Sequence, residues 1–258
     1  MTGARLQVVL AGLAIGVLLA ACQPGNTKDD DQTGDLGRNQ PQSPADIYVN
    51  LGLAYMREGQ PAVALRKLKY GLELDPRNAQ VHNVIAILYQ ELGDDALAGE
   101  HFQRAAALAP KDPSIRNNWG RLLCVQQKFA EADEQFQRAL QNPLYESPWV
   151  ALTNAGICAQ LAGNQAAAET YFRQALSANG RFAPALTQMA QLSYQRGDYA
   201  AARSYLERYH QVAGHNPQSL LLAIRLERQL GSPGQARIYE KQLREHFPDA
   251  PEIVQLNR

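Results

Sequence analysis

The sequence has no excess of charge of either sign. Lys and Arg number 25, and Asp and Glu also number 25, so the formal net charge is 0. Binding to nucleic acid or to an anionic membrane surface by charge alone requires a strong positive field, which this composition does not supply. We therefore expect no nucleic-acid partner and a function that does not depend on bulk charge.

The sequence also lacks the motifs of common active sites. It contains no phosphate-binding GxxxxGK[ST] loop, no zinc-binding HExxH, no GxSxG nucleophile turn and no CxxC pair. Five histidines are present, and none has the spacing of a metal ligand: His82, His101, His210, His215 and His246. The sequence thus predicts a protein that is not an enzyme and that uses no cofactor, metal ion or small-molecule substrate.

The one long apolar run is too short to cross a membrane. Residues 8–21 are apolar without interruption, which is 14 residues, whereas a transmembrane helix needs about 20. This length is typical of the core of a secretion signal peptide. The run ends in Leu-Ala-Ala-Cys, the pattern of a lipobox. We predict that residues 1–21 are a lipoprotein signal peptide that is removed and that Cys22 carries covalent lipid. The alternative is an ordinary signal peptide with an incidental cysteine.

The residue after Cys22 indicates in which membrane the lipoprotein is expected to reside. In lipoproteins of double-membraned bacteria an Asp at this place retains the protein in the inner membrane, and here the residue is Gln23. We therefore expect a lipid anchor in the outer membrane, with the folded body on its periplasmic face. Residues 22–44 are polar and rich in Gly, Pro, Asp and Gln, which predicts a disordered tether. Its KDDD run is typical of a solvated segment rather than of a metal site.

Cysteine is scarce in the rest of the chain. Only Cys124 and Cys158 follow Cys22. An oxidising periplasm would allow them to form a disulfide. A free cysteine, however, behaves as a small buried hydrophobe. The sequence therefore favours two buried, unpaired thiols and leaves the disulfide as an open alternative.

An internal repeat organises the chain after the tether. Six alanines recur at spacings of 34, 34, 36, 34 and 34 residues: Ala64, Ala98, Ala132, Ala168, Ala202 and Ala236. Most units also have a small residue twelve positions before the alanine and Leu or Phe four positions after it. The pattern resembles the tetratricopeptide repeat, a pair of antiparallel helices that must stack on its neighbours to bury its apolar face.

We predict an all-α fold, a right-handed superhelical solenoid of six tetratricopeptide repeats over residues 45–250. The predicted repeats are 45–78, 79–112, 113–148, 149–182, 183–216 and 217–250, followed by a C-terminal tail at 251–258. The third repeat carries two extra residues around QNPLYESPW, which we expect to alter the local stacking. The sixth repeat has Ile224 in place of the small residue and Glu240 in place of the bulky one. Such a polar replacement is typical of a capping repeat.

The first helices of stacked repeats line a groove, and helical spacing indicates which side chains face it. In the first helix of the first repeat, one face packs on the second helix. The neighbouring face presents Val49, Leu53 and Met56 at spacing i, i+4, i+7. The matching positions of repeats two to four are Asn83, Ile87 and Gln90; Asn117, Arg121 and Cys124; and Thr153, Ile157 and Gln160. The groove is thus predicted to be apolar at its N-terminal end and polar further along.

An apolar groove suits an amphipathic helix or an extended apolar segment of a partner protein. We predict that the partner-binding residues are Val49, Leu53, Met56, Asn83 and Ile87. The alternative is that the tether or a terminal element of the chain covers this patch.

Three segments carry a closer family resemblance. They are YVNLGLAYMREGQPAVALRKLKYGLELDP, RNNWGRLLCVQQKFAEADEQFQRAL and SLLLAIRLERQLGSPGQARIYEKQL. Together with the lipobox and six repeats, they resemble the type IV pilus biogenesis and stability lipoproteins, the pilotins of that system. The resemblance implies an outer-membrane lipoprotein that binds the type IV pilus secretin (PilQ) and supports its outer-membrane localisation and multimerisation, and hence pilus biogenesis and twitching motility. The alternative is a periplasmic repeat scaffold for peptidoglycan hydrolases.

Overall fold

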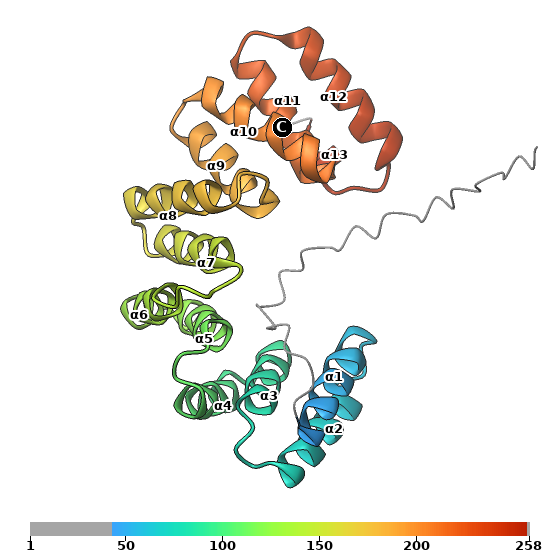
Figure 1. The fold of residues 1–258 in the computed structure, drawn as a ribbon. Coiled ribbons are helices and arrows are strands. Elements are labelled where there is room, and N and C mark those ends of the chain that lie inside the picture. The colour runs from blue at the N-terminus through green and yellow to red at the C-terminus, as the bar shows by residue number, and fades with distance from the viewer. Residues whose placement is uncertain (1–42, 257–258) are drawn as a thin grey trace, which may run out of the picture. The chain divides into compact units, whose positions relative to one another are not determined.

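The computed structural model describes residues 43–256. The predicted signal peptide, the lipid on Cys22 and nearly all of the tether lie outside the described residues. Within that range the chain forms thirteen helices and no strands (Figure 1). They are α1 (Pro44–Arg57), α2 (Pro61–Leu74), α3 (Ala79–Glu91), α4 (Asp95–Leu108), α5 (Pro113–Val125), α6 (Phe129–Leu140), α7 (Pro148–Leu161), α8 (Gln165–Ala178), α9 (Ala183–Gln195), α10 (Tyr199–Ala213), α11 (Pro217–Gln229), α12 (Pro233–His246) and α13 (Glu252–Gln255).

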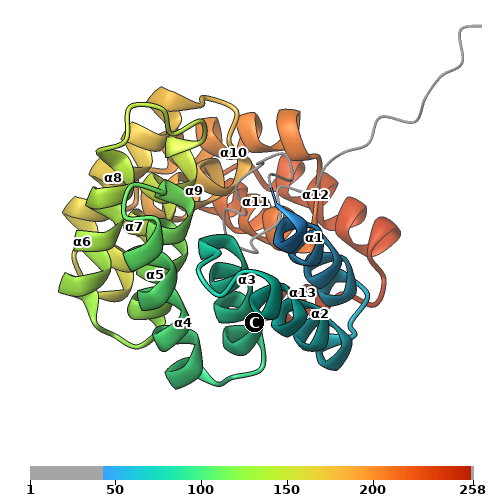
Figure 2. The same cartoon turned by 60° about the horizontal axis from the view of Figure 1, so that its bottom comes forward.

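The helices associate as consecutive pairs. The most extensive contacts join α1 to α2, α3 to α4, α5 to α6, α7 to α8, α9 to α10 and α11 to α12. The first helix of each pair also packs on the first helix of the next pair, from α1 through to α11. The pairs therefore stack in chain order, and the first helices lie toward the inner side of the curved stack (Figure 2). The predicted all-α solenoid of helix pairs is confirmed.

Close approach within a pair depends on the small and bulky positions of the repeat. A Cβ added at Gly120 of α5 would lie 2.7 Å from Cε1 of Phe136, so no larger residue fits there unless the ring moves. Gly156 of α7 has the same relation to Phe172 of α8. Both phenylalanine side chains are fully buried. The ring thus occupies the space that the missing side chain of the glycine leaves open.

The turn between the two helices of each pair requires one residue with a left-handed backbone conformation, that is, with positive φ. Glycine provides it in most pairs, with φ between 67° and 80° at Gly59, Gly93, Gly163, Gly197 and Gly231. The third pair uses Gln127 at the same repeat position, with φ of 60°. A side chain in this conformation costs energy that glycine does not incur. This turn is therefore the one strained connection of its kind among the residues that the structure describes.

The two extra residues of the third repeat are absorbed in a loop. Residues 141–147 connect α6 to α7, whereas residues 75–78 and 109–112 make the earlier connections between pairs. Tyr145 is buried in this loop, and the neighbouring Leu144 is 84% exposed. Helices α6 and α7 still pack on each other. The insertion therefore lengthens the connection without opening the stack.

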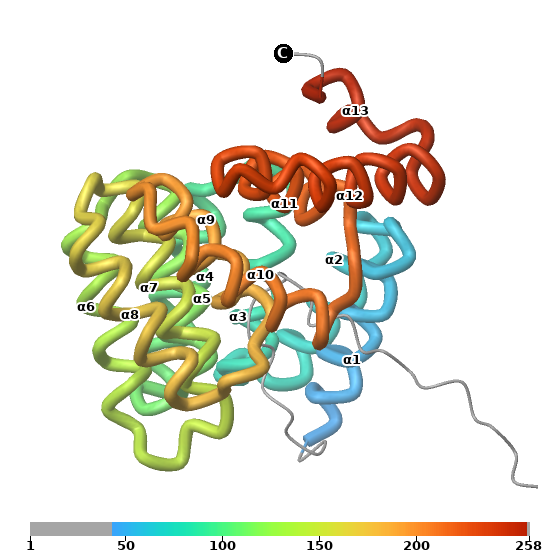
Figure 3. Tube along the Cα trace, turned by 90° about the horizontal axis from the view of Figure 1, so that it is seen from above, coloured from blue at the N-terminus to red at the C-terminus, as the bar shows by residue number. Residues whose placement is uncertain are grey.

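The C-terminal end of the solenoid is covered by α13. Figure 3 shows α11 and α12 side by side, with α13 beyond them. Leu256 is buried in a cluster with Leu220, Ile224 and Leu243. The segment predicted as a tail thus contains a short helix that packs on the last repeat. Glu240, half-buried, forms ion pairs with Arg228 and Arg244, so the polar replacement of the sixth repeat serves a surface network.

Cys124 and Cys158 form a disulfide, so the preference for unpaired thiols was wrong. Their Cα atoms are 5.6 Å apart, and the bond links α5 to α7. Cys124 lies eight residues before Ala132 and Cys158 lies ten residues before Ala168, so the two cysteines differ by two positions in the repeat. Both lie near the ends of first helices that pack together. The packing of α5 against α7 therefore brings the two thiols into bonding range.

Loss of this disulfide should lower the stability of the stack. For a loop closed over a separation of 34 residues, chain entropy predicts a cost of about 3–4 kcal/mol. Urea unfolding of wild type and of the Cys124→Ala/Cys158→Ala protein measures it. Reductant should destabilise the wild type and leave the double variant unchanged. Equal unfolding midpoints for oxidised wild type and double variant would show that the bond contributes nothing.

Candidate partner-binding groove

The first repeat places its three predicted groove residues at the inner face of α1. Val49, Leu53 and Met56 are partly buried and pack against a cluster that includes Val84 and Leu88 of α3. Each side chain keeps part of its surface in solvent because α1 has only one first helix beside it, α3. The N-terminal end of the groove is therefore apolar and accessible.

The structure places two other predicted contact residues in the interior. Asn83 is 0% exposed and Ile87 is 5% exposed. The amide of Asn118 donates to Oδ1 of Asn83 at 3.3 Å, which links α5 to α3. Asn83 therefore bonds one repeat to the next and presents no surface to a partner. Ile87 belongs to a core cluster that also contains Phe102 and Leu122.

The same burial recurs at the equivalent positions further along. Asn117 is fully buried, and its Oδ1 accepts a hydrogen bond of 2.9 Å from Asn154 of α7. Thr153 is also buried, and its hydroxyl donates to the carbonyl of Trp149. Side chains at this position enter the crevice between neighbouring first helices. Of the residues four and seven positions later, Ile157 and Gln160 keep partial exposure, whereas Ile87 and Cys124 are buried.

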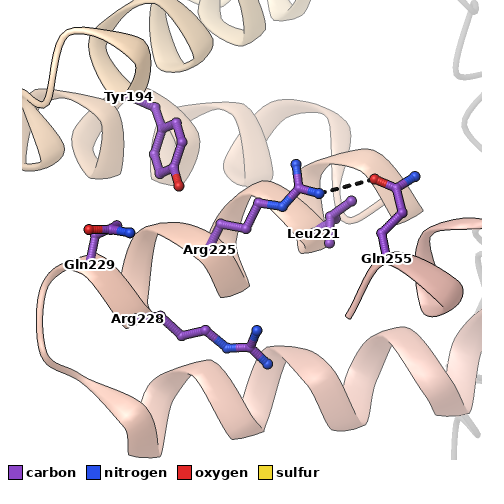
Figure 4. Close-up of a pocket in the computed structure, with 6 residues that line it drawn as sticks. All are labelled: Tyr194, Leu221, Arg225, Arg228, Gln229 and Gln255. Atoms are coloured by element: carbon purple, nitrogen blue, oxygen red, sulfur yellow. Dashed lines mark hydrogen bonds between the residues drawn. The ribbon is translucent and has the colours of Figure 1, made fainter. Parts of the chain in front are cut away.

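Extending the same register to the last two repeats identifies residues that the sequence reasoning missed. Tyr194 of α9 matches Met56, and Leu221, Arg225 and Arg228 of α11 match Val49, Leu53 and Met56. They line a hollow of about 460 Å³ together with Gln229 and Gln255 (Figure 4). The repeat spacing would have found Leu221 and the two arginines. Gln255 could not be found this way because it comes from α13, outside the repeats.

The outer face of the first pair is also apolar and uncovered. Ile47 is 53% exposed, whereas its equivalents Val81 and Ile115 are 0% exposed because the preceding repeat covers them. Tyr70 and Leu74 of α2 are also exposed, by 45% and 46%. No residue in the range 43–256 covers this face. The N-terminal repeat thus offers apolar surface both in the groove and on its open end.

The groups with shifted pKa values lie outside the groove. His82 and His101 approach each other with their Nδ1 atoms 3.0 Å apart, and burial lowers the pKa of both. Burial, followed by the hydrogen bond to Asp133, raises the pKa of Tyr171 to about 12. These shifts follow from packing between helices. Within residues 43–256, no group of three or more His, Cys, Asp or Glu side chains could hold a metal ion, and no helix meets the length and apolarity of a membrane span.

His210 makes stability depend on pH. Burial, with a smaller contribution from His215, lowers the pKa of His210 to about 4, and its buried Nε2 has no partner. As pH falls below about 6.5, His210 binds a proton in the unfolded chain but stays neutral in the folded protein. The free energy of unfolding should therefore decrease between about pH 6.5 and pH 4.

Urea titrations across this pH range, compared with a His210→Phe variant, measure the effect. The variant should show a shallower pH dependence. An identical slope in both proteins would show that another group is responsible.

The chain matches known proteins over nearly its whole length. The tetratricopeptide repeat model matches residues 49–113, 117–184 and 187–251. The type IV pilus assembly protein PilF of Pseudomonas aeruginosa is 31% identical over 240 residues, which is 93% of each chain. The crystal structure of PilW, a widely conserved type IV pilus biogenesis factor, is similar with a TM-score of 0.77 and 30% identity, over 84% of this chain and 100% of that one. The structure of Pseudomonas aeruginosa PilF gives a TM-score of 0.73 at 30% identity, over 83% and 96%.

Stacked helix pairs with a groove along their first helices define a tetratricopeptide-repeat scaffold, a class of protein-interaction module. The sequence similarity to PilF extends over 93% of the chain, and the structural similarity to PilW over 84% of it. The chain belongs to the family of type IV pilus biogenesis proteins that includes PilF and PilW.

Proposed function

We propose that this protein is an outer-membrane lipoprotein that binds the type IV pilus secretin, PilQ, and supports its localisation and multimerisation. One observation carries the proposal: Val49, Leu53 and Met56 form an accessible apolar surface at the N-terminal end of the groove. Apolar side chains kept partly in water favour contact with an apolar partner. Membership of the PilF and PilW family supports a partner from the pilus machinery.

The chemistry of a secretin protomer fits this surface. Before its barrel closes, a membrane β-barrel protein exposes apolar strands that cannot remain unpaired in the periplasm. A groove that covers part of this surface would keep the protomer from aggregating. The contact would be released when neighbouring protomers bury the same strands. The groove thus provides temporary shielding and requires no chemical step.

The lipid on Cys22 completes the proposed role. Several acyl chains on one residue would hold the protein at the membrane, because each buried CH₂ contributes about 0.8 kcal/mol. A polar tether between Cys22 and α1 would let the groove reach secretin in the periplasm. The anchor would therefore carry a bound secretin to the outer membrane.

Co-purification tests the proposal. The mature lipoprotein, tagged at its C-terminus and purified in detergent from the cell envelope, should retain PilQ on an immunoblot. An unrelated outer-membrane lipoprotein with the same tag is the matched control. Recovery of peptidoglycan hydrolases without PilQ would contradict the proposal and favour the hydrolase scaffold.

A further inference from the structure

Two arginines, Arg225 and Arg228, line the hollow at the C-terminal end of the groove, and no carboxylate is among the lining residues. Glu240 pairs with both Arg228, at 3.5 Å, and Arg244, at 2.9 Å. Among residues 43–256, Arg225 and Arg237 have no carboxylate within 4 Å. The nearby Glu227 is buried and pairs with Arg203. The excess of positive charge is therefore confined to the lining of the hollow, because residues 217–256 as a whole carry five basic and five acidic side chains.

Arg225 is held in place without being neutralised. Its guanidinium donates to Oε1 of Gln255 at 3.0 Å, and Gln255 carries no charge (Figure 4). Gln255 is fixed because the next residue, Leu256, is buried against α11. The guanidinium keeps its remaining N–H donors for a ligand. A positioned donor loses less conformational entropy on binding than a free side chain.

The surroundings of Arg225 are those of a peptide site. Leu221 forms an apolar floor and Tyr194 faces the hollow from α9, while Gln229 and Gln255 offer amides (Figure 4). An apolar floor, an aromatic ring and amides match the side chains and backbone of a peptide. The hollow also lies on the register of Leu53 and Met56, so it continues the groove.

We propose that this hollow binds an acidic peptide segment of a protein partner, with separate carboxylates of that segment on Arg225 and Arg228. Arginine suits this role because its planar guanidinium donates two parallel hydrogen bonds to a carboxylate. An apolar side chain beside these carboxylates would lie on Leu221. The site goes beyond the proposed function, since it lies at the opposite end of the groove and does not depend on the secretin.

Fluorescence anisotropy with two labelled peptides tests the site. The probe is Leu-Glu-Asp-Leu-Glu, and the matched control peptide is Leu-Gln-Asn-Leu-Gln. The mature lipoprotein in detergent should bind the acidic peptide, more weakly as salt rises, and should bind the amide peptide at least about tenfold less. Equal binding of the two peptides would overturn the proposal.

Substitutions of single arginines test whether the acidic peptide binds in the hollow. Arg225→Gln and Arg228→Gln should each weaken binding of the acidic peptide by about tenfold. Arg173→Gln removes an exposed arginine that pairs with Glu169 on α8 and should leave binding unchanged. All three positions are exposed, so the variants should fold. Unchanged affinity in both groove variants would overturn the site.

Two further outcomes would assign the hollow to another occupant. If the peptide binds only after Asp29, Asp30 and Asp31 are changed to Asn, the chain's own acidic segment occupies the site. If phosphatidylglycerol vesicles bind the protein through Arg225 and the peptide does not, the site recognises a lipid headgroup. Either result would overturn the proposal of a partner peptide.

Discussion

Leu53→Asp is expected to prevent binding of the secretin while the protein stays folded. The substitution places a carboxylate on the partly exposed apolar surface where the partner would exclude water. Burying an unpaired charge in such a contact costs several kcal/mol, and about 3 kcal/mol corresponds to roughly a hundredfold loss of affinity. Co-purification of PilQ with the variant, quantified by immunoblot against wild type, measures the loss.

A matched variant on the same helix controls for the added charge. Asn50 is exposed on α1, so Asn50→Asp adds the same carboxylate away from the groove and should retain the secretin. Circular dichroism must show native helix content in both proteins. If Leu53→Asp disturbs folding, Leu53→Asn reports on the same contact without a charge. Retention of PilQ by a folded Leu53→Asp protein would show that the secretin binds elsewhere.

Phe136→Ala is expected to destabilise the solenoid strongly. The ring is fully buried beside Gly120, and removing it leaves a cavity that the fixed helix pair cannot close. Truncation of a buried phenylalanine costs about 3–5 kcal/mol. Because each repeat contacts only its neighbours, the loss should also weaken the stack on both sides. Urea unfolding followed by circular dichroism measures the change.

Glu134→Ala is the control on the same helix. Glu134 is exposed and pairs with Arg138 one turn later, a contact that contributes about 0.3–0.5 kcal/mol. Its loss should hardly move the unfolding midpoint. A change below about 1 kcal/mol for Phe136→Ala would contradict the role given to the small and bulky positions.

The sequence predicted the helix pairs because the repeat constrains them physically. A fixed alanine, a small residue and a bulky Leu or Phe recur in register, and together they admit one kind of packing. Ala64 and Ala98 illustrate this, since both are fully buried between paired helices. Such a pattern depends on contacts within a repeat and is therefore visible in the sequence.

Features that depend on neighbouring repeats were harder to predict. Helical spacing placed Asn83 and Ile87 on the groove face, but the approach of successive first helices buries both. The disulfide between Cys124 and Cys158 depends on the same approach. Helix α13 lies outside the repeat, so no register predicted that Gln255 would bond to Arg225. The distance between successive first helices decides the burial of Asn83 and Ile87 and the disulfide, and the sequence of a single repeat does not reveal this distance.

The measurement that tests the proposed role most directly is membrane fractionation with an immunoblot for the secretin. Wild type, a strain lacking this protein and a Cys22→Ala strain would be compared. We predict that heat-stable secretin multimers disappear from the outer membrane in the deletion strain. We also predict that Cys22→Ala reduces them there, because the protein would lose its anchor. Normal multimers in the outer membrane of the deletion strain would contradict the account.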